Sequence, residues 1–352
     1  VDDWKANNPQ YLSKKRLDTM WSYFYCFNFN PTYDASYKPE DWLKAVNNEN
    51  FRHSIMSAFD RAYAIRAFEP DDPESILQNT ITPETFCSDG TTDFSREPAL
   101  ADNEAKDLFF NADKALEYKK AAMEELSAQG VTFPITMVMT YKSGDSDWEN
   151  EYILAKQQIE SVLGTDYVVC ELYAGPSESF LSETRRAGKY SFMRCNWGAD
   201  YIDPQTWTDP FDGKDNLDPD TGKCIGNSYN RMDAYYYPDK TTLFPETNAI
   251  LTEYYTKVEE AKAEVSDTVK RYQLFAEAED ILIEHALVVP YYISPSTYVA
   301  TKVNIFEGQY SPSGISRLRF KGQKVSDHFI DMDEYQKNYD AWLAVIENGG
   351  AK

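Results

Sequence analysis

The sequence predicts an α/β protein in which helices cover a sheet, and two observations carry this prediction. In the middle of the chain, segments with the alternating pattern of strands follow segments with the pattern of helices, and several changes between them are marked by Gly or Pro. The resulting order, strand–helix–strand–helix–strand, is typical of a layered α/β lobe. The chain has 352 residues, which is enough for two lobes or domains.

The individual elements are expected in a definite order. A strand rich in aromatic residues at 21–29 precedes an amphipathic helix at 51–61, which Asn50 is expected to cap. The middle of the chain then contains a helix at 115–129, a strand at 131–141, a helix at 148–163, a strand at 167–173, a helix at 179–187 and a strand at 190–197. Helices at 246–263 and 266–285, a strand at 288–292, irregular strands at 299–320 and a helix at 333–346 complete the chain.

Composition narrows the classes of function. Asp and Glu number 58 against 35 Lys and Arg, so the formal net charge is −23. A protein this acidic repels nucleic acid and anionic membrane surfaces, so neither is expected as a partner. No apolar run approaches the length of about 18 residues that a membrane-spanning helix needs. Aromatic residues make up 15% of the chain, a richness that suits a recognition surface as well as a core.

Cysteine and histidine usage argues against a metal centre or a disulfide framework. The five cysteines are odd in number, and none forms a Cys-x-x-Cys pair. We therefore expect buried small hydrophobes at Cys26, Cys87, Cys170, Cys195 and Cys224. The three histidines are scattered along the chain, so no metal and no cofactor is expected.

Two further segments keep alternative interpretations. The acidic segment 209–222 is either a calcium loop or a solvated acidic loop, and its spacing lacks the calcium-binding pattern, which favours the solvated loop. The aromatic cluster at 235–238 lines either a cleft or the edge of a lobe.

The stretch 188–204 carries the strongest signal for binding. Its strand runs into Trp197 and Gly198, and Asp200 follows shortly after. A zwitterion is one ligand that such a set could hold, with Asp200 meeting an ammonium, Arg194 a carboxylate and Trp197 the apolar surface. The alternative is a buried tryptophan, a surface ion pair and a turn.

The same stretch resembles a known family. Residues 196–204 (Asn-Trp-Gly-Ala-Asp-Tyr-Ile-Asp-Pro) resemble the Trp-x-Ala-Asp-Tyr-x-Asp/Glu-Pro segment of the oligopeptide- and dipeptide-binding proteins of ABC importers. The resemblance implies that Asp200 binds the α-amino group of a peptide and that basic residues upstream, Arg185 and Arg194, meet a ligand carboxylate. It also implies a ligand cleft lined by Asn196, Trp197, Gly198 and Tyr201. The helix at 51–61 resembles a structural helix of the same family.

The resemblance extends to the organisation of the chain. It implies a periplasmic-binding-protein-like fold of type II, in the peptide-binding class, with a large lobe and part of a first lobe. Residues 1–27 are expected to be a connecting segment of the first lobe, 28–290 the C-terminal ligand-binding lobe, and 291–352 the return segment and C-terminal helix. The chain is then expected to begin well inside the architecture of the family, as a C-terminal fragment.

The function that the resemblance implies is uptake of oligopeptides without catalysis. The protein is expected to be a monomer outside the cytoplasm, either a cell-surface lipoprotein or periplasmic, and to deliver peptides to membrane permease subunits. Two alternatives stay open. One is a glycoside hydrolase that uses Glu183 and Asp200, or Asp200 and Asp203. The other is a non-peptide ligand in the same fold, such as an oligosaccharide, a metal chelate or haem. Motifs for nucleophilic, zinc-dependent or phosphate-binding chemistry are absent from the sequence.

Overall fold

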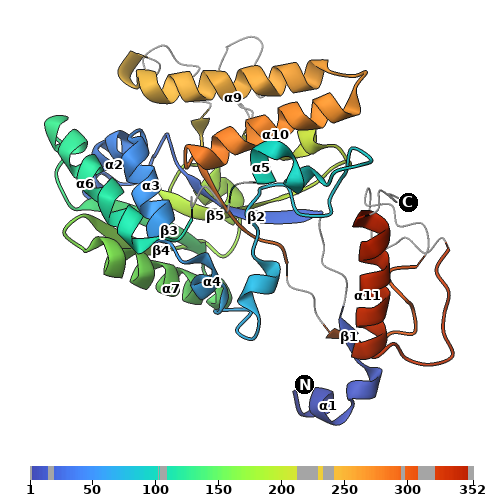
Figure 1. Ribbon diagram of the computed structural model, residues 1–352. Helices are drawn as coiled ribbons and strands as arrows, with labels where there is room; N and C mark the ends of the chain where they lie inside the picture. Colours follow the sequence, from blue (N-terminus) through green and yellow to red (C-terminus); the bar gives the residue numbers. More distant parts are fainter. Residues whose placement is uncertain are drawn as a thin grey trace.

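A computed structural model describes residues 2–14, 20–101, 103, 109–211, 229–232, 242–294, 298–307 and 322–347. Figure 1 shows a large body of helices packed around strands, and beside it a smaller group formed by segments from both ends of the chain. This mixed arrangement confirms the predicted α/β class. The smaller group contains α1 (Asp2–Asn7), β1 (Ser13–Lys14), β7 (Tyr298–Val299) and α11 (Met332–Glu347), and β1 pairs with β7 in antiparallel fashion.

The large body contains two sets of strands. Strand β2 (Trp21–Phe27) lies between β5 (Phe192–Gly198) and β6 (Val288–Tyr292), and both pairings are antiparallel. Strands β3 (Ile135–Lys142) and β4 (Val168–Gly175) form a parallel pair. The N–H of Ser191 donates to the carbonyl of Val138 at 2.7 Å, and this bond ties the start of β5 to β3.

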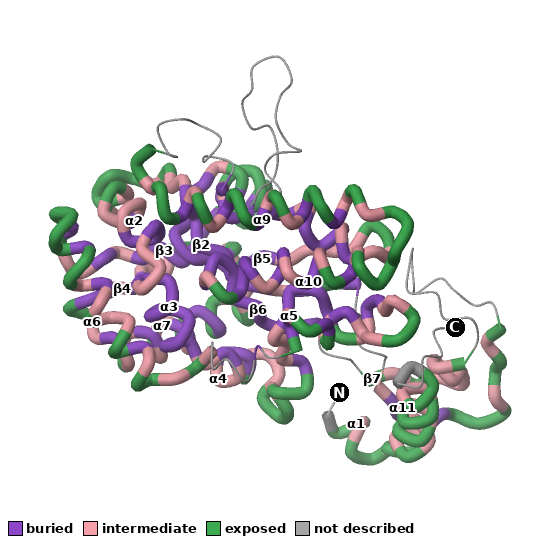
Figure 2. The backbone as a smooth tube through the Cα atoms, turned by 45° about the horizontal axis from the view of Figure 1, so that its top comes forward, coloured by how far each residue is buried: buried purple, intermediate pink, exposed green. Residues whose placement is uncertain are grey.

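Helices cover these strands from two sides (Figure 1). On one side lie α2 (Pro39–Val46), α3 (Glu49–Ala58), α4 (Arg61–Ile65), α6 (Ala112–Ala128) and α7 (Ser146–Leu163). On the other lie α5 (Pro98–Ala101), α9 (Pro245–Ala263) and α10 (Thr268–Glu284). Short 3₁₀ turns occur at Pro9–Tyr11, Ala35–Tyr37, Pro73–Ile76, Phe94–Arg96 and Pro204–Trp207. Figure 2 shows the buried residues concentrated on the strands and on the inner sides of these helices.

Two local predictions are corrected. Helix α3 begins earlier than expected, and its cap is Asn48 rather than Asn50: the side chain of Asn48 accepts from the N–H of Phe51 at 2.8 Å. The amide of Asn50 instead donates to Glu125. The segment 179–187 contains a π-helical turn, Leu181–Arg185, in place of an α-helix. There the N–H of Arg186 donates to the carbonyl of Leu181 at 2.9 Å, the five-residue spacing that defines a π-helix.

The cysteine prediction is confirmed where the structure describes it. Cys26, Cys87, Cys170 and Cys195 are free thiols buried in the core. Cys224, most of the acidic segment 209–222 and the aromatic cluster at 235–238 lie outside the described residues. In the described part of the chain, no helix is both long enough and apolar enough to cross a membrane.

Candidate ligand-binding site

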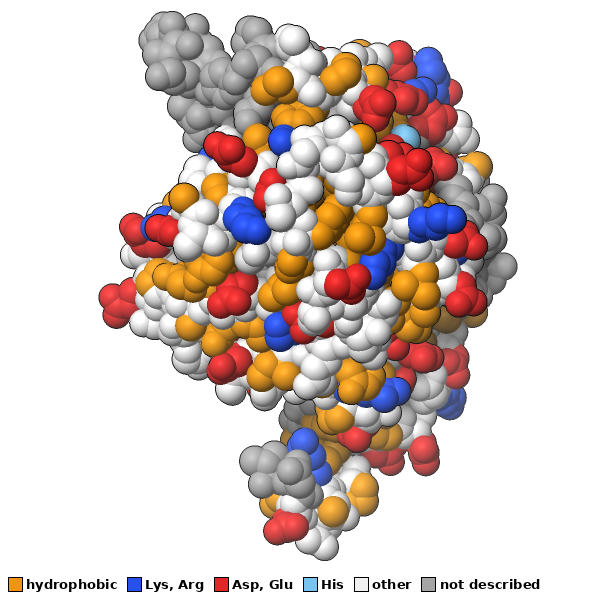
Figure 3. Space-filling model, turned by 90° about the vertical axis from the view of Figure 1, so that its left-hand side faces the viewer, with side chains coloured by type: hydrophobic (Ala, Val, Ile, Leu, Met, Phe, Trp, Pro, Cys, Tyr) orange, Lys and Arg blue, Asp and Glu red, His pale blue; other side chains and the backbone are white. Residues whose placement is uncertain are grey.

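A hollow of about 430 Å³ opens beside strand β5 and the π-helical turn. The charged side chains that line it are all basic: Lys142, Arg185, Arg186 and Arg194. No Asp or Glu lines it among the described residues. The chain as a whole carries a formal charge of −23. Acidic side chains are scattered over the face drawn in Figure 3. A basic hollow in so acidic a protein favours an anionic group.

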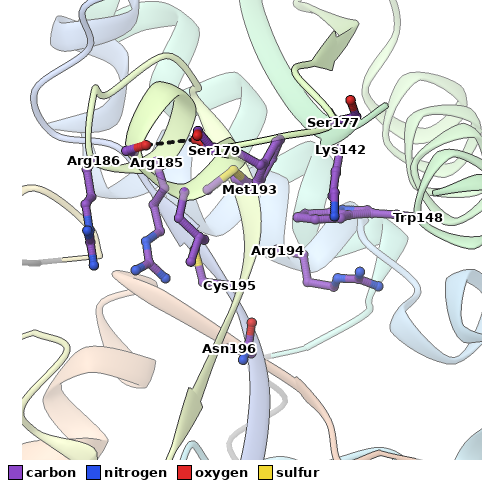
Figure 4. A pocket seen from close by; sticks show the side chains of 13 residues that line it. Lys142, Trp148, Ser177, Ser179, Arg185, Arg186, Met193, Arg194, Cys195 and Asn196 are labelled. Carbon is purple, nitrogen blue, oxygen red and sulfur yellow. Dashed lines mark hydrogen bonds between the residues drawn. The ribbon is translucent and has the colours of Figure 1, made fainter. Parts of the chain in front are cut away.

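Two arginines lie on different sides of strand β5. Figure 4 shows Arg194 reaching to one side of the strand, beneath the ring of Trp148, while Arg185 lies on the other side near Cys195. Trp148 comes from helix α7, and its ring centre lies 4.4 Å from the guanidinium carbon of Arg194. Arg185 belongs to the π-helical turn that precedes β5. The hollow therefore spans the strand, with a cation on each side.

Arg194 is held in a buried ion pair. Its guanidinium donates to the carboxylate of Glu151 on helix α7 and, at 3.3 Å, to the hydroxyl of Tyr292. Glu151 has no exposed side-chain surface, and the side chain of Arg194 is 13% exposed. The hydroxyl of Tyr25 donates to the second oxygen of Glu151. Both carboxylate oxygens of Glu151 are thus satisfied by neighbours within the fold.

The electrostatics of this pair follow from burial and contact. Burial raises the pKa of the Glu151 carboxyl, and the Arg194 guanidinium opposes that shift. For Arg194, burial opposes the charge, but the neighbouring Glu151 outweighs burial and raises the pKa. A guanidinium stays protonated in proteins, and here it donates directly to the carboxylate. Arg194 and the buried Glu151 therefore form an ion pair within the fold.

Arg185 has a different environment. It is 7% exposed, and its guanidinium carbon lies 3.7 Å from the centre of the Tyr229 ring. Among the described residues, no carboxylate forms an ion pair with it. A cation–π contact stabilises a guanidinium by about 0.5–2 kcal/mol, which is less than a buried charge loses in leaving water. Within the described part of the chain, Arg185 is thus a buried cation without a counter-ion.

Asp200 lies just beyond the end of β5. It is exposed, and its backbone N–H donates to the hydroxyl of Thr206 at 3.1 Å. The next residue, Tyr201, is 38% exposed and its hydroxyl lies 3.4 Å from a carboxylate oxygen of Asp209. Burial first, and then the charges of Asp209, Asp203 and Asp200, raise the pKa of Tyr201. The end of the strand is therefore locally negative and suits a cation.

Trp197 and Gly198 close the strand. Trp197 is half-buried and meets Tyr229 edge-on, with ring centres 6.0 Å apart. Its indole N–H is buried and has no hydrogen-bond partner among the described residues. A Cβ on Gly198 would lie 2.9 Å from the ring of Trp21 on the neighbouring strand, so glycine is what allows that ring to lie across β5.

The structure brings together only part of the predicted set. Arg185, Arg194 and Asn196 line the hollow, whereas Asp200, Trp197, Gly198 and Tyr201 are not among its lining residues. Asp203, one of the carboxylates considered for a hydrolase, is occupied: it caps a turn by accepting from the N–H of Gln205 and is bound by Arg271. Glu183 is exposed and does not line the hollow.

Sequence reasoning missed Lys142, Trp148 and Glu151. Glu151 had a detectable signal, because it lies on the same helical face as the buried residues Tyr152, Ala155 and Ile159. A carboxylate in an apolar stripe needs a partner. The identity of that partner, Arg194, depends on how α7 packs against the sheet.

The described part of the chain is thus an α/β protein with basic residues beside β5 and an exposed acid just past its end. The chain belongs to the bacterial extracellular solute-binding proteins, family 5, because the model for the middle part of that family matches residues 2–218.

Curated relatives agree with this assignment. The oligopeptide-binding protein AliB of Streptococcus pneumoniae is 29% identical over 356 aligned positions, which cover 94% of this chain and 52% of AliB. AmiA of the same species, also an oligopeptide-binding protein, is 28% identical over 85% of this chain and 47% of its own. The chain thus spans about half the length of the curated relatives it matches.

Similar folds are found among solved structures. Listeria monocytogenes OppA bound to peptide superposes with a TM-score of 0.59 and 19% identity, covering 92% of this chain and 52% of that one. The substrate-binding domain of an oligopeptide ABC transporter from Bacillus anthracis gives a TM-score of 0.60 at 19% identity, over 92% and 53% of the two chains. These likenesses confirm the predicted fold class.

Proposed function

We propose that this chain forms the ligand-binding lobe of the substrate-binding component of an ABC importer and that its ligands are oligopeptides. The observation that carries the proposal is the charge arrangement along β5. A basic hollow, with no acid among its described lining residues, lies beside the strand, and an exposed acid, Asp200, lies just past its end. A peptide carries an ammonium at one end and a carboxylate at the other. Its two ends therefore match the two signs of charge.

In this proposal, Asp200 receives the α-amino group. An ammonium that loses water in a closing cleft needs a carboxylate partner, because an unpaired buried charge is strongly unfavourable. Trp197, Gly198, Asn196 and Tyr201 then form the wall along which the first residues of the peptide lie. The basic hollow takes the carboxylate end. The relatives named above are described as oligopeptide-binding proteins, which supports a peptide over a glycan or a hydrolase substrate.

The wider setting belongs to the same proposal. Residues 1–27 enter from the first lobe and cross into the sheet through β2, 28–290 form the ligand-binding lobe, and 291–352 return to the first lobe. The protein acts as a monomer outside the cytoplasm, as a cell-surface lipoprotein or in the periplasm. It binds its ligand without turnover, closes over it and delivers it to membrane permease subunits.

Mass spectrometry of the small molecules released from the purified native protein tests the proposal. We expect peptides with free α-amino groups, present in an amount comparable to that of the protein. Recovery of oligosaccharides, or of a metal chelate in place of peptides, would contradict it.

A further inference from the structure

Two arginines line the basic hollow from opposite sides of β5, and they differ in their counter-ions. Arg194 donates to Glu151, which is fully buried in helix α7. Arg185 is 7% exposed and rests on the ring of Tyr229, and no carboxylate in the described part of the chain pairs with it. Among the described residues, only one of the two guanidinium groups has a carboxylate partner.

We propose that Glu151 decides which arginine recognises the carboxylate of the ligand: by neutralising Arg194, it leaves that task to Arg185. The inference rests on the proposed function, since it takes the ligand to be a peptide with a free carboxylate. It assigns Glu151 the role of a positioning residue, because Glu151 acts on the ligand only through Arg194.

The contacts around Arg194 explain why it does not serve the ligand. The backbone N–H of Arg194 donates to the hydroxyl of Tyr152 at 2.9 Å, and its guanidinium lies beneath Trp148 and beside Tyr23. A ligand carboxylate that bound Arg194 would either displace Glu151, which would leave a buried carboxylate without its cation, or share the guanidinium and lie close to a like charge. Both outcomes are unfavourable, because a buried charge needs its partner and like charges repel.

The environment of Arg185 favours the opposite outcome. The hollow beside it holds Arg186 and Lys142, both exposed, and the serines Ser177, Ser179 and Ser182. No acid among the described residues lines this hollow. A planar guanidinium binds a carboxylate through two parallel hydrogen bonds. A ligand carboxylate at Arg185 supplies a counter-ion that no described residue provides, and it displaces none of the described groups.

The consequence for selectivity is a preference for free C-termini that depends on Arg185. Hydrogen bonds to a charged partner account for a change of about tenfold to a hundredfold in affinity. The native protein should therefore retain peptide acids over the matching peptide amides by about that factor. Glu151 keeps the second cation from contributing to this preference.

The test is a competition between two forms of one pooled library. Short random peptides are prepared as free acids and as isotopically labelled C-terminal amides, mixed in equal amounts and offered to the native protein. Mass spectrometry of the retained peptides then gives an acid-to-amide ratio. This ratio does not change when a variant merely loses stability, because loss of folded protein lowers the retention of both forms alike.

Arg185→Gln should bring the ratio to about one, and Arg185→Lys, which keeps the charge without the planar fork, should give an intermediate ratio. The decisive variant is Arg185→Gln combined with Glu151→Gln. Glutamine preserves the shape of Glu151 but frees the charge of Arg194, so the double variant should recover a ratio of about tenfold or more. Glu160→Gln, on the same helix and paired with Lys156, is the matched control and should leave the native ratio unchanged.

The outcomes separate this inference from the proposed function. If the native protein retains peptides with a ratio of about one, the role of Arg185 is refuted while peptide binding stands. If the double variant stays at about one, the role of Glu151 is refuted. A loss of the acid preference in Arg194→Gln with retention in Arg185→Gln would reverse the assignment of the arginines. Retention of neither form by the native protein would contradict the proposed function itself.

Discussion

Arg271 on helix α10 donates two hydrogen bonds to the carboxylate of Asp203, one from Nε at 3.0 Å and one from a terminal nitrogen at 2.9 Å. Asp203 caps the turn that follows Asp200, and the N–H of Asp200 donates to Thr206 in that turn. Helix α10, which lies far from Asp200 in the sequence, therefore holds the segment that carries Asp200, the residue proposed to bind the ammonium group.

Arg271→Lys tests this relationship. Lysine keeps the charge but cannot bind both oxygens of Asp203 in a planar fork. We expect the free energy of unfolding to fall by about 1–3 kcal/mol, measured by urea denaturation, and peptide affinity to weaken because Asp200 is less well placed. Lys270→Ala is the matched control, since Lys270 is 62% exposed and pairs with Glu264 at 3.1 Å. Equal effects of the two substitutions would contradict the role of Arg271.

Glu279 makes the stability of the fold depend on pH. It is 5% exposed, and its carboxylate accepts from the N–H groups of Ile81 and Thr82 and from the hydroxyl of Thr82. Burial raises its pKa from 4.5 to about 7, and the hydrogen bonds from Thr82 and Ile81 oppose that shift. Between these values the folded state binds more protons than the unfolded state. The free energy of unfolding therefore decreases as the pH rises through this window, by about 3 kcal/mol.

Urea denaturation of Glu279→Gln at about pH 5 and about pH 7.5 isolates this contribution. Glutamine does not titrate, so the variant should lose about 2 kcal/mol of the pH dependence between these two pH values. The pKa values of Glu97 and His285 are also raised, so these groups contribute to the pH dependence with the same sign. The quantity to compare is therefore the difference in pH dependence between the native protein and Glu279→Gln. Glu277→Gln, at a partly exposed position that pairs with Lys257, should keep the full dependence. An undiminished slope in Glu279→Gln would refute the prediction.

The buried thiols should be chemically inert in the folded protein. Burial raises the pKa of Cys26, Cys87 and Cys170, and the thiolate is the reactive form. Iodoacetamide at about pH 8 should leave these three thiols unmodified in the native protein and modify them all after denaturation, as measured by peptide mass spectrometry. Rapid modification of any of the three under native conditions would show that its surroundings open.

The fold was largely predictable because its signals are local. The apolar face of the helix around Ile55 and the aromatic strand around Tyr25 are periodic patterns that the sequence displays directly. Boundaries were less accessible, as Asn48 shows: Asn47, Asn48 and Asn50 all stand near the start of α3, and the observed backbone of that turn is what selects Asn48. The π-helical turn before Arg186 likewise has no periodic signature.

The site was predictable only in part. The segment around Asp200 is a contiguous motif, so its residues could be named from the sequence. The pairing of Arg194 with Glu151 joins residues 43 positions apart, and it arises from the packing of α7 on the sheet. Strand alternation alone could not tell which of the arginines is neutralised, because that depends on what each side of β5 faces.

Calorimetry with Asp200→Asn tests the central claim most directly. The substitution keeps the shape of the side chain and removes its charge, so binding of a peptide with a free α-amino group should weaken by about 2–5 kcal/mol. The N-acetylated form of the same peptide should bind the native protein about as poorly, and the substitution should have little further effect on it. Equal affinity of the native protein for the free and acetylated peptides, with Asp200→Asn unchanged, would remove Asp200 from the site and contradict the account.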